Sequence, residues 1–201
     1  MDEANIILSY WFYKHYRLDV IKKLMLNKKP LWFNSTPQID NEISENFSDM
    51  LKMAGDGKYN DWITCKNRNL AYIILCDQFP RHIFRNKAEA FSYDERALDI
   101  CLYGLDHGFD KHLNIFQKYF FYLPLMHSEN KNIQMLSKVY YDDLIKGFFW
   151  PPKVKKFVRE FVYRHKEIID RFGRYPHRNE ALGRISSAEE LAFLKEPMSS
   201  F

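Results

Sequence analysis

The sequence predicts an all-α protein, and three observations support this prediction. Long segments repeat apolar residues at intervals of three and four, which is the period of a helix with one buried face. Sustained alternation of apolar and polar residues, the pattern of strands, occurs nowhere in the 201 residues. Seven glycines and eight prolines are few for a fold of many tight turns. We therefore expect about nine helices joined by short loops, arranged as antiparallel helix pairs.

A single all-helical domain spanning residues 1–201 is expected from length and composition. Apolar residues make up 46% of the chain and aromatic residues 17%, with 17 Phe and 13 Tyr. A chain of this length buries roughly 70% of its unfolded surface, so its core needs no metal or disulfide for stability. No linker or low-complexity segment divides the sequence.

Charge and cysteine content favour a cytoplasmic protein without a membrane segment. The 30 Lys and Arg nearly balance the 26 Asp and Glu, so the formal charge of +4 disfavours nucleic-acid binding. Cys65, Cys76 and Cys101 form no C-x-x-C motif and cannot all pair, which fits reduced thiols in a cytoplasm. The N-terminus lacks the basic region of a signal peptide, and no apolar run is long enough to span a bilayer.

The clearest helix is expected at Lys153–Phe172, where apolar residues follow one face and basic residues the other. A proline pair precedes it and Gly173 follows it, as suits a helix start and a C-cap. Thr36 and Pro37 predict an N-cap followed by proline, and Ser186–Glu189 fits a capping box. The other expected helices are Ala4–Tyr16, Val20–Leu26, Gln38–Ala54, Trp62–Cys76, Ala88–Gly104, Leu113–Leu123, Glu129–Lys146 and Ala188–Lys195.

Two acidic residues interrupt apolar helical patterns. Asp77 ends a long apolar run, so its carboxylate is expected to point into the interior. Pro80 should end that helix, because proline disfavours a helical residue before it. Asp94 also falls on the apolar side of its expected helix. Since a lone buried carboxylate is costly, we expect both to pair with Arg81 or Arg85, either as a structural lock or as part of a ligand site.

A Tyr-Leu-Pro-Leu-Met-His-Ser-Glu segment ends at Glu129. Pro124 should end one helix, and Ser128 is expected to cap the next, with Glu129 in its first turn. The free N–H groups of a helix start favour anions. His127, Glu129 and Gln134 are therefore candidates for ligand binding.

The strongest sign of a site is a turn in which four arginines gather after the last long helix. Between residues 171 and 184 they meet one acid, Glu180, while glycines and a proline force the backbone to turn. Guanidinium groups are planar forks suited to carboxylate and phosphate, and crowding them causes repulsion. We expect an anion there, either a carboxylate of the protein or a ligand. The candidates in this arginine-rich turn are Arg171, Arg174, His177, Arg178, Asn179 and Arg184.

Histidine supplies the candidate catalytic groups. His165 lies on the apolar face of its helix, so it is either a satisfied core residue or part of a site near the arginine-rich turn. His127, His165 and His177 are candidates because imidazole transfers protons near neutral pH. No metal or cofactor is expected. The segment Asp106–His112 has metal-type side chains but no zinc spacing, and is expected to be a surface loop.

At these residues the chain resembles a bacterial family catalogued as domain of unknown function nine-two-four. Three blocks carry the resemblance, and the similarity extends over nearly the whole chain. They are Asp77–Arg81 with Phe84, Arg85, Ala90, Phe91 and Asp94; Tyr122–Glu129 with Gln134; and His165–Ser186. This chain has His82 and Ser187 where the family usually has Asn and Thr.

The resemblance implies a helical fold similar to the tetratricopeptide-like superfamily, and it implies no reaction. Its blocks coincide with the pattern-breaking residues, so we expect these side chains to converge. One hypothesis is a cleft for a phosphate- or carboxylate-bearing small molecule, with or without hydrolase-type activity. Arg174, Arg178 and Arg184 would then clamp the anion, histidines would move protons, and Asp77 and Asp94 would orient the arginines. The alternatives are a helical scaffold for an acidic peptide or partner protein, and a purely structural network.

Overall fold

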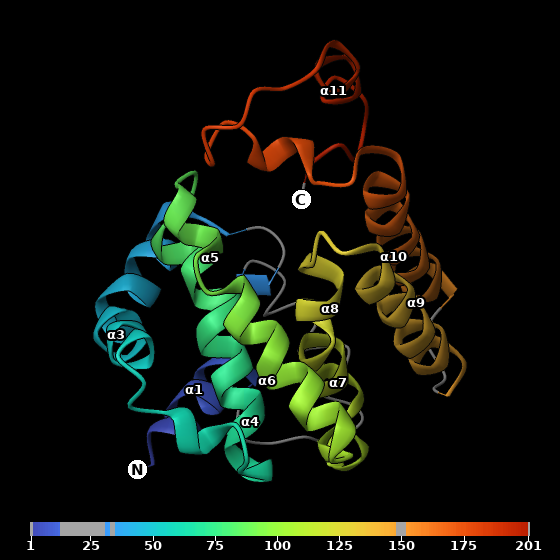
Figure 1. Ribbon diagram of the computed structural model, residues 1–201. Helices are drawn as coiled ribbons and strands as arrows, with labels where there is room; N and C mark the ends of the chain where they lie inside the picture. Colours follow the sequence, from blue (N-terminus) through green and yellow to red (C-terminus); the bar gives the residue numbers. More distant parts are fainter. Residues whose placement is uncertain (1, 13–30, 33–34, 148–151, 201) are drawn as a thin grey trace. The chain divides into compact units, whose positions relative to one another are not determined.

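The computed structural model describes residues 2–12, 31–32, 35–147 and 152–200 (Figure 1). These residues form helices and no strand, which confirms the predicted all-α class. Their contacts divide the chain into two compact units. Unit 1 comprises residues 1–85 and 89–109, and unit 2 comprises residues 86–88 and 110–201. The helix expected at Val20–Leu26 and the end of that expected at Ala4–Tyr16 lie outside the described residues. The single domain and the tetratricopeptide-like arrangement stay predictions.

Unit 1 is built around aromatic side chains from several helices. Its helices are α1 (Glu3–Phe12), α3 (Pro37–Gly55), α4 (Lys66–Ile73), α5 (Phe79–Ile83) and α6 (Asp94–Asp106). α3 packs against α5, and α4 packs against α1 and α6. The rings of Phe47 and Phe79 lie 4.3 Å apart, and the Trp11 ring meets Phe79 edge-on at 5.7 Å. The N-cap expected at Thr36 is confirmed, because its hydroxyl accepts a hydrogen bond from the Ile39 N–H.

The chain continues as a helix through Pro80, so the helix end expected there is wrong. A π turn spanning Ile74–Gln78 follows α4 directly, and α5 begins at Phe79. In a π turn each N–H reaches five residues back, as the Phe79 N–H does to the Ile74 carbonyl. The wider turn accommodates the Pro80 ring, which would clash with the carbonyl four residues earlier in an α-helix. Asp77 lies in this turn and is 0% exposed, as predicted for its carboxylate.

Two other expected helices are interrupted. The segment expected at Trp62–Cys76 begins with a 3-10 turn at Asn60–Trp62, and α4 starts only later. The segment expected at Ala88–Gly104 is a 3-10 turn at Ala88–Phe91 followed by α6. Asp94 therefore stands in the first turn of α6, where an acidic residue is stabilised by the free N–H groups of the helix.

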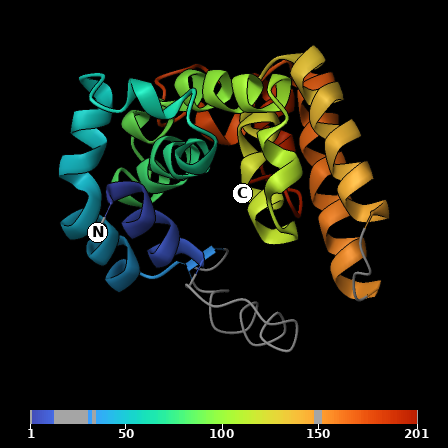
Figure 2. The same ribbon diagram turned by 90° about the horizontal axis from the view of Figure 1, so that it is seen from below.

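Unit 2 is dominated by a pair of long helices. Its helices are α7 (Ile115–Phe121), α8 (Leu123–His127), α9 (Lys131–Lys146), α10 (Pro152–Phe172) and α11 (Ala188–Phe193), with a 3-10 turn at Pro176–Arg178. α9 and α10 run side by side in the orange colours of Figure 2, and α8 packs against α9. Ile168 and Ile169 of α10 form a buried cluster with Tyr175 and Phe193. This cluster holds the segment after α10 against the helix.

The helix expected at Lys153–Phe172 is confirmed as α10, and so is the role of Gly173. This glycine has a φ of +71°, and its N–H bonds to the Ile169 carbonyl, as in a left-handed C-cap. The capping box at the start of α11 joins Ser187 to Glu190. The box expected at Ser186–Glu189 is therefore one residue too early.

The start of α9 also differs from the expectation. α7 ends before Pro124, as predicted, and α8 then carries this proline in its first turn. The N-cap of α9 is Asn130, whose side chain accepts two backbone N–H groups of the first turn. The cap expected at Ser128 is wrong, since Ser128 ends α8. Glu129 lies before the cap and not in the first turn, so its carboxylate is available to residues outside the helix.

The long helices are amphipathic and not uniformly apolar. α10 places charged residues opposite the buried side chains of Val158, Val162 and Ile169. Within the described part of the chain, no helix is both long and apolar enough to cross a membrane.

Candidate functional site

In unit 1, Arg81 links the two predicted interior carboxylates. Its Nη1 lies 2.9 Å from Asp94 Oδ1 and 3.5 Å from Asp77 Oδ1. Nη2 donates to Asp94 Oδ2 at 3.1 Å, and the Gln78 amide donates to Asp77 Oδ2 at 2.5 Å. Both carboxylates therefore pair with an arginine, as predicted. The pairing joins the π turn to the start of α6.

Arg85, the other arginine of this block, pairs with Asp40 of α3. Its Nε donates to Asp40 Oδ2 at 2.6 Å, and Nη2 donates to Oδ1 at 2.8 Å. Ser35 Oγ and His82 Nδ1 lie 2.7 and 2.8 Å from Oδ1. Burial alone would raise the pKa of Asp40, but the hydrogen bonds from Arg85, Ser35 and His82 outweigh burial, and the pKa lies below its ordinary value. Asp40 is absent from the predicted site residues, because an acid in a helix does not by itself indicate a partner 45 residues away.

Ser35, His82 and Asp40 do not form a nucleophilic triad. In such a triad the serine contacts one ring nitrogen and the carboxylate contacts the other. Here Ser35 Oγ at 3.2 Å and Asp40 Oδ1 at 2.8 Å both face Nδ1 of His82. The cluster instead fastens the residues before α3 to α5.

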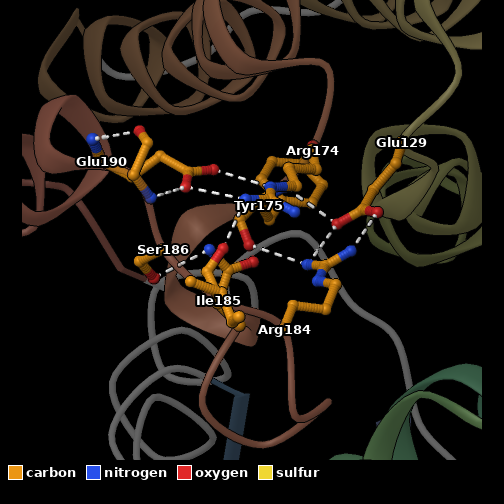
Figure 3. Close-up of polar contacts among 9 residues, drawn as sticks. Glu129, Arg174, Tyr175, Arg184, Ile185, Ser186 and Glu190 are labelled. Carbon is orange, nitrogen blue, oxygen red and sulfur yellow. Dashed lines mark hydrogen bonds and ion pairs between the residues drawn. The ribbon is translucent and has the colours of Figure 1, made fainter.

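In unit 2, Glu129 is the anion that meets the arginine-rich turn (Figure 3). Arg184 donates Nη1 to Oε2 at 2.8 Å and Nη2 to Oε1 at 3.1 Å, the two-pronged geometry of strong arginine–carboxylate pairs. The Tyr175 N–H donates to Oε1 at 2.8 Å. Burial raises the pKa of Glu129, but the bonds from Arg184 and Tyr175, with the charges of Arg184 and Arg178, outweigh burial and lower it.

Glu190 is a second internal anion for the same turn. Arg174 donates Nε to Glu190 Oε1 at 2.7 Å and Nη2 to Oε2 at 2.8 Å (Figure 3). These bonds, opposed by burial, lower the pKa of Glu190 to about 2. At the surface, Arg171 Nε donates to Glu189 at 2.8 Å. Arg171, Arg174 and Arg184 thus meet carboxylates of the protein itself.

Asn179 closes the turn from within. Its side-chain amide donates to Ser186 Oγ at 2.9 Å, and its backbone carbonyl accepts the backbone N–H of Arg184 at 2.8 Å. Asn179 is almost completely buried. Its role in the described structure is to hold the two ends of the turn together.

Gln134 and Tyr175 form a buried hydrogen-bond network beside the turn. Gln134 Nε2 lies 2.6 Å from the Met126 carbonyl, 2.7 Å from the Ser128 carbonyl and 2.9 Å from the Tyr175 hydroxyl. The Tyr175 hydroxyl donates to the Met126 carbonyl at 2.5 Å. The two carbonyls fix the amide, since turning it over would set Oε1 against two acceptors. The network ties the end of α8 to α9 and to the segment after α10.

Two of the three histidines predicted as proton carriers lie beside Tyr175, and the charge of the third, His127, acts on His165. The ring centroids of His165 and His177 lie 5.6 and 5.5 Å from that of Tyr175. The Arg178 guanidinium lies 4.6 Å over the same ring and donates to the His127 carbonyl at 3.1 Å. We call His127, His165, His177 and Arg178 the histidine cluster. The charges of the other three members lower the pKa of His165.

The His165 ring has a defined tautomer in this environment. The residue is 2% exposed, and its Nδ1 donates to the Phe161 carbonyl at 2.8 Å. Nε2 is therefore the proton-accepting nitrogen of the neutral ring. Burial lowers the pKa of His165 well below its ordinary value, and the cationic forms of the other cluster members lower it further, against the Phe161 hydrogen bond. The ring is neutral at neutral pH.

The segment with metal-type side chains makes contacts of its own. Asp110 is buried and accepts a hydrogen bond from the Tyr122 hydroxyl at 2.9 Å. His107 stacks on Tyr103, with 3.9 Å between ring centroids. Across the described ranges, no three His, Cys, Asp or Glu side chains are grouped so that they could hold a metal ion.

The predicted site residues thus fall into two groups. Unit 1 holds Asp77, Arg81, Arg85 and Asp94, and unit 2 holds His127, Glu129, Gln134, His165, Arg171, Arg174, His177, Arg178, Asn179 and Arg184. That both groups serve one ligand stays a prediction. Tyr175 and Glu190 were not predicted as site residues. For Glu190 the signal was its three-residue spacing from Ser187, which marks a capping box.

Comparison with known proteins agrees with the resemblance of the sequence blocks. A family model described as "Bacterial protein of unknown function (DUF924)" matches residues 7–198. A solved structure of a protein of unknown function from Agrobacterium tumefaciens is also similar, with a TM-score of 0.74 and 28% sequence identity. The match covers 88% of this chain and 95% of that chain. No curated protein sequence matches this chain.

Proposed function

We propose that this chain, which belongs to the DUF924 family, binds a small phosphate- or carboxylate-bearing molecule at the histidine cluster of unit 2. The observation that carries the proposal is the gathering of His165, His177 and Arg178 around the buried Tyr175 ring, with His127 near enough for its charge to act on His165. Cationic forms of these groups repel one another. A bound anion would relieve this repulsion and accept their hydrogen bonds.

The other arginines of the turn take a holding role in this proposal. Arg174 and Arg184 were expected to clamp the anion, but each is engaged by two oxygens of a glutamate. A guanidinium held in this way has its charge balanced inside the protein, so it attracts an anionic ligand less strongly than an unpaired one. Their pairs with Glu190 and Glu129 would keep the turn, and with it His177 and Arg178, in place.

Hydrolase-type activity would use His165 as the proton acceptor. Its Nε2 carries the lone pair of the neutral ring, and the low pKa keeps that nitrogen unprotonated at neutral pH. A base beside an anion site suits the activation of water for attack on a phosphate ester. Phosphate release from p-nitrophenyl phosphate, measured for the parent protein and for His165→Gln, tests this activity. Equal release by both proteins would remove His165 from the reaction.

A purely structural role for the sequence blocks is the second candidate. The pairs of Glu129 with Arg184 and of Glu190 with Arg174 favour it, because they satisfy arginines inside the protein. In that case the histidine cluster would be a packed part of the core. The two candidates differ in one measurable respect, which is whether an added anion binds saturably.

Inorganic phosphate is the probe that separates the two candidates. Histidine side-chain NMR signals are followed during a phosphate titration at constant ionic strength, so that general screening stays fixed. The anion site predicts saturable shifts of the His127, His165 and His177 signals. His82 and His107, which lie in unit 1, serve as internal controls and should not shift. Saturable binding should also raise the melting temperature, since a ligand at a hundredfold its Kd adds about 2.7 kcal/mol.

Two matched substitutions locate the binding. His177→Asn should weaken phosphate binding by about tenfold, equivalent to about 1.4 kcal/mol, because an imidazole that can bind an anion in its protonated form is lost. His107→Asn, on the surface of unit 1, should leave it unchanged. His177 is half-buried, so circular dichroism should show an intact fold in the first variant. Equal phosphate affinity in both variants, or no saturable shift in the parent, would refute the anion site.

A further inference from the structure

Two buried polar atoms on α9 make no hydrogen bond within the part of the chain that the structure describes. They are Oε1 of Gln134, a residue 1% exposed, and Oγ of Ser137, a residue 0% exposed. Residues three apart on a helix lie on the same face, so the two side chains start from the same side of α9. Buried polar atoms are nearly always bonded, which makes this pair a place where a further group is expected.

Only one of the two orientations of the Gln134 amide fits its surroundings. Its Nε2 faces the carbonyls of Met126 and Ser128, both of which only accept hydrogen bonds. If the amide were turned over, Oε1 would face two carbonyls that cannot donate a hydrogen bond to it. The two carbonyls would also lose the N–H groups that they accept from. Oε1 is therefore an acceptor whose donor must come from outside these contacts.

This polar pair adjoins the histidine cluster. Nε2 and Oε1 of Gln134 share one carbon, and Nε2 lies 2.9 Å from the Tyr175 hydroxyl. The Tyr175 ring is the one that His165, His177 and Arg178 surround. His177 is half-buried, whereas Gln134 and Ser137 are enclosed. A ligand held by its charge at the cluster would therefore present its other end to α9.

We infer that the ligand is an anion that also carries a hydroxyl group, which bonds to Gln134 Oε1 and Ser137 Oγ. This inference rests on the proposed anion site. A hydroxyl both donates and accepts, so one such group donates to Gln134 Oε1 and accepts from the Ser137 hydroxyl. An alkyl group in the same place would leave both atoms unpaired, and sites of this kind reject analogues that lack the hydroxyl.

Two probes of equal carbon count test the inference. Glycerol 3-phosphate carries hydroxyls, and propyl phosphate carries the same phosphate on three carbons without them. Calorimetric titration of the parent protein should show at least tenfold tighter binding of glycerol 3-phosphate, or about 1.4 kcal/mol. Ser137→Ala should bring this ratio close to one while propyl phosphate binds as before. Ser137 has no hydrogen bond to lose, so its variant should fold, and Ser44→Ala on α3 is the matched control.

The outcomes separate the inference from the proposed function. Equal binding of both probes by the parent, or an unchanged ratio in Ser137→Ala, would overturn the hydroxyl subsite while leaving the anion site in place. An enclosed water bonded to both atoms would give this result. If neither probe nor inorganic phosphate binds, the anion site itself is refuted and the inference falls with it.

Discussion

Two buried histidines, one in each unit, have contrasting surroundings. His82 Nδ1 lies 2.8 Å from the Asp40 carboxylate, which favours a protonated ring. His165 Nδ1 donates to the Phe161 carbonyl, and the charges that lower its pKa come from the other members of the histidine cluster. Burial lowers the pKa of both rings. At His82 the Asp40 carboxylate opposes burial and the charges of Arg85 and Arg81 add to it. At His165 the charges of the other cluster members add to burial, and the Phe161 hydrogen bond opposes it.

The contrast shows how a cluster with balanced charges differs from a candidate ligand site. In unit 1, Asp40 accepts hydrogen bonds from Arg85, Ser35 and His82 together, so opposite charges are balanced within the protein. In the histidine cluster, four groups that can carry positive charge lie close together, and Glu129, the carboxylate on which the Arg178 charge acts, is itself paired with Arg184. Such an arrangement is unfavourable for stability and is typical of functional sites, where the balancing charge arrives with a ligand.

The largest expected effect tests the balanced side of this comparison. Arg81→Met removes the cation between Asp77 and Asp94 and leaves Asp77 as a buried carboxylate. Breaking such a pair should lower the free energy of unfolding by roughly 3–5 kcal/mol, measured by urea denaturation. A loss below about 1 kcal/mol, the range of surface pairs, would show that the Arg81 ion pairs contribute little.

Glu129→Gln tests the carboxylate that Arg184 meets from outside the arginine-rich turn. Both Glu129 and Arg184 are only partly buried, so the loss should be about 2 kcal/mol, between the values of exposed and buried pairs. The substitution keeps an oxygen for the Tyr175 N–H and removes the charge. Urea denaturation at pH 7 measures it, and a loss equal to that of Arg81→Met would erase the distinction drawn between the two regions.

The pH dependence of stability compares the two histidines directly. A folded pKa below the unfolded value of about 6.5 means that the unfolded chain takes up protons first as the pH falls. The contribution of each histidine to the free energy of unfolding is therefore fully present above pH 6.5. It declines below that pH, by at most about 1.4 kcal/mol per pH unit for each histidine. His165→Asn should remove more of the decline between pH 6.5 and 5 than His82→Asn, because His82 retains the opposing Asp40 charge.

Carboxylates do not obscure this measurement. Asp40, Glu129 and Glu190 have lowered pKa values, so their stabilisation is present above about pH 4.5 and is lost only as the pH falls further. Denaturation curves between pH 5 and 7.5 thus report mainly on histidine. If the two Asn variants change the decline equally, the environments are equivalent and the comparison fails.

The smallest effect is expected for Arg171→Gln. Its partner Glu189 is exposed, and Arg171 itself lies at the surface. Exposed pairs contribute little because water screens them and long side chains lose freedom when they are fixed. Unfolding free energy should change by less than about 0.5 kcal/mol, and a larger loss would show that this pair belongs to the internal network.

Much of the fold follows from local patterns in the sequence. The period of α10, the Thr36 cap and the Gly173 terminus depend on neighbouring residues alone, and all three are confirmed. The errors arose where distant residues or an unusual turn decided the outcome. The passage through Pro80 needed a π turn, whose extra residue leaves no mark in an apolar run. Asn130 instead of Ser128 caps α9, and polar residues side by side look equally suitable in sequence.

The site was predictable in its residue types more than in its pairings. Asp77 was expected to be buried because it breaks an apolar period, and it is. The arginine excess indicated an anion, but local sequence could not tell that Glu129 would serve Arg184 across 55 residues. Glu190 was concealed by its ordinary capping position. Long-range ion pairs depend on tertiary packing, which a period or a spacing does not encode.

The π turn gives the chain a register that depends on residue count. It holds one residue more than the α-helical turn it replaces, and each residue of an α-helix turns the chain by about 100°. Deletion of a single residue between Ile74 and Gln78 would restore the α-helical period and rotate Phe79 away from Phe47 and Trp11. Homologues that lack this residue would need a different aromatic arrangement in unit 1, so the length of this segment is itself under physical constraint.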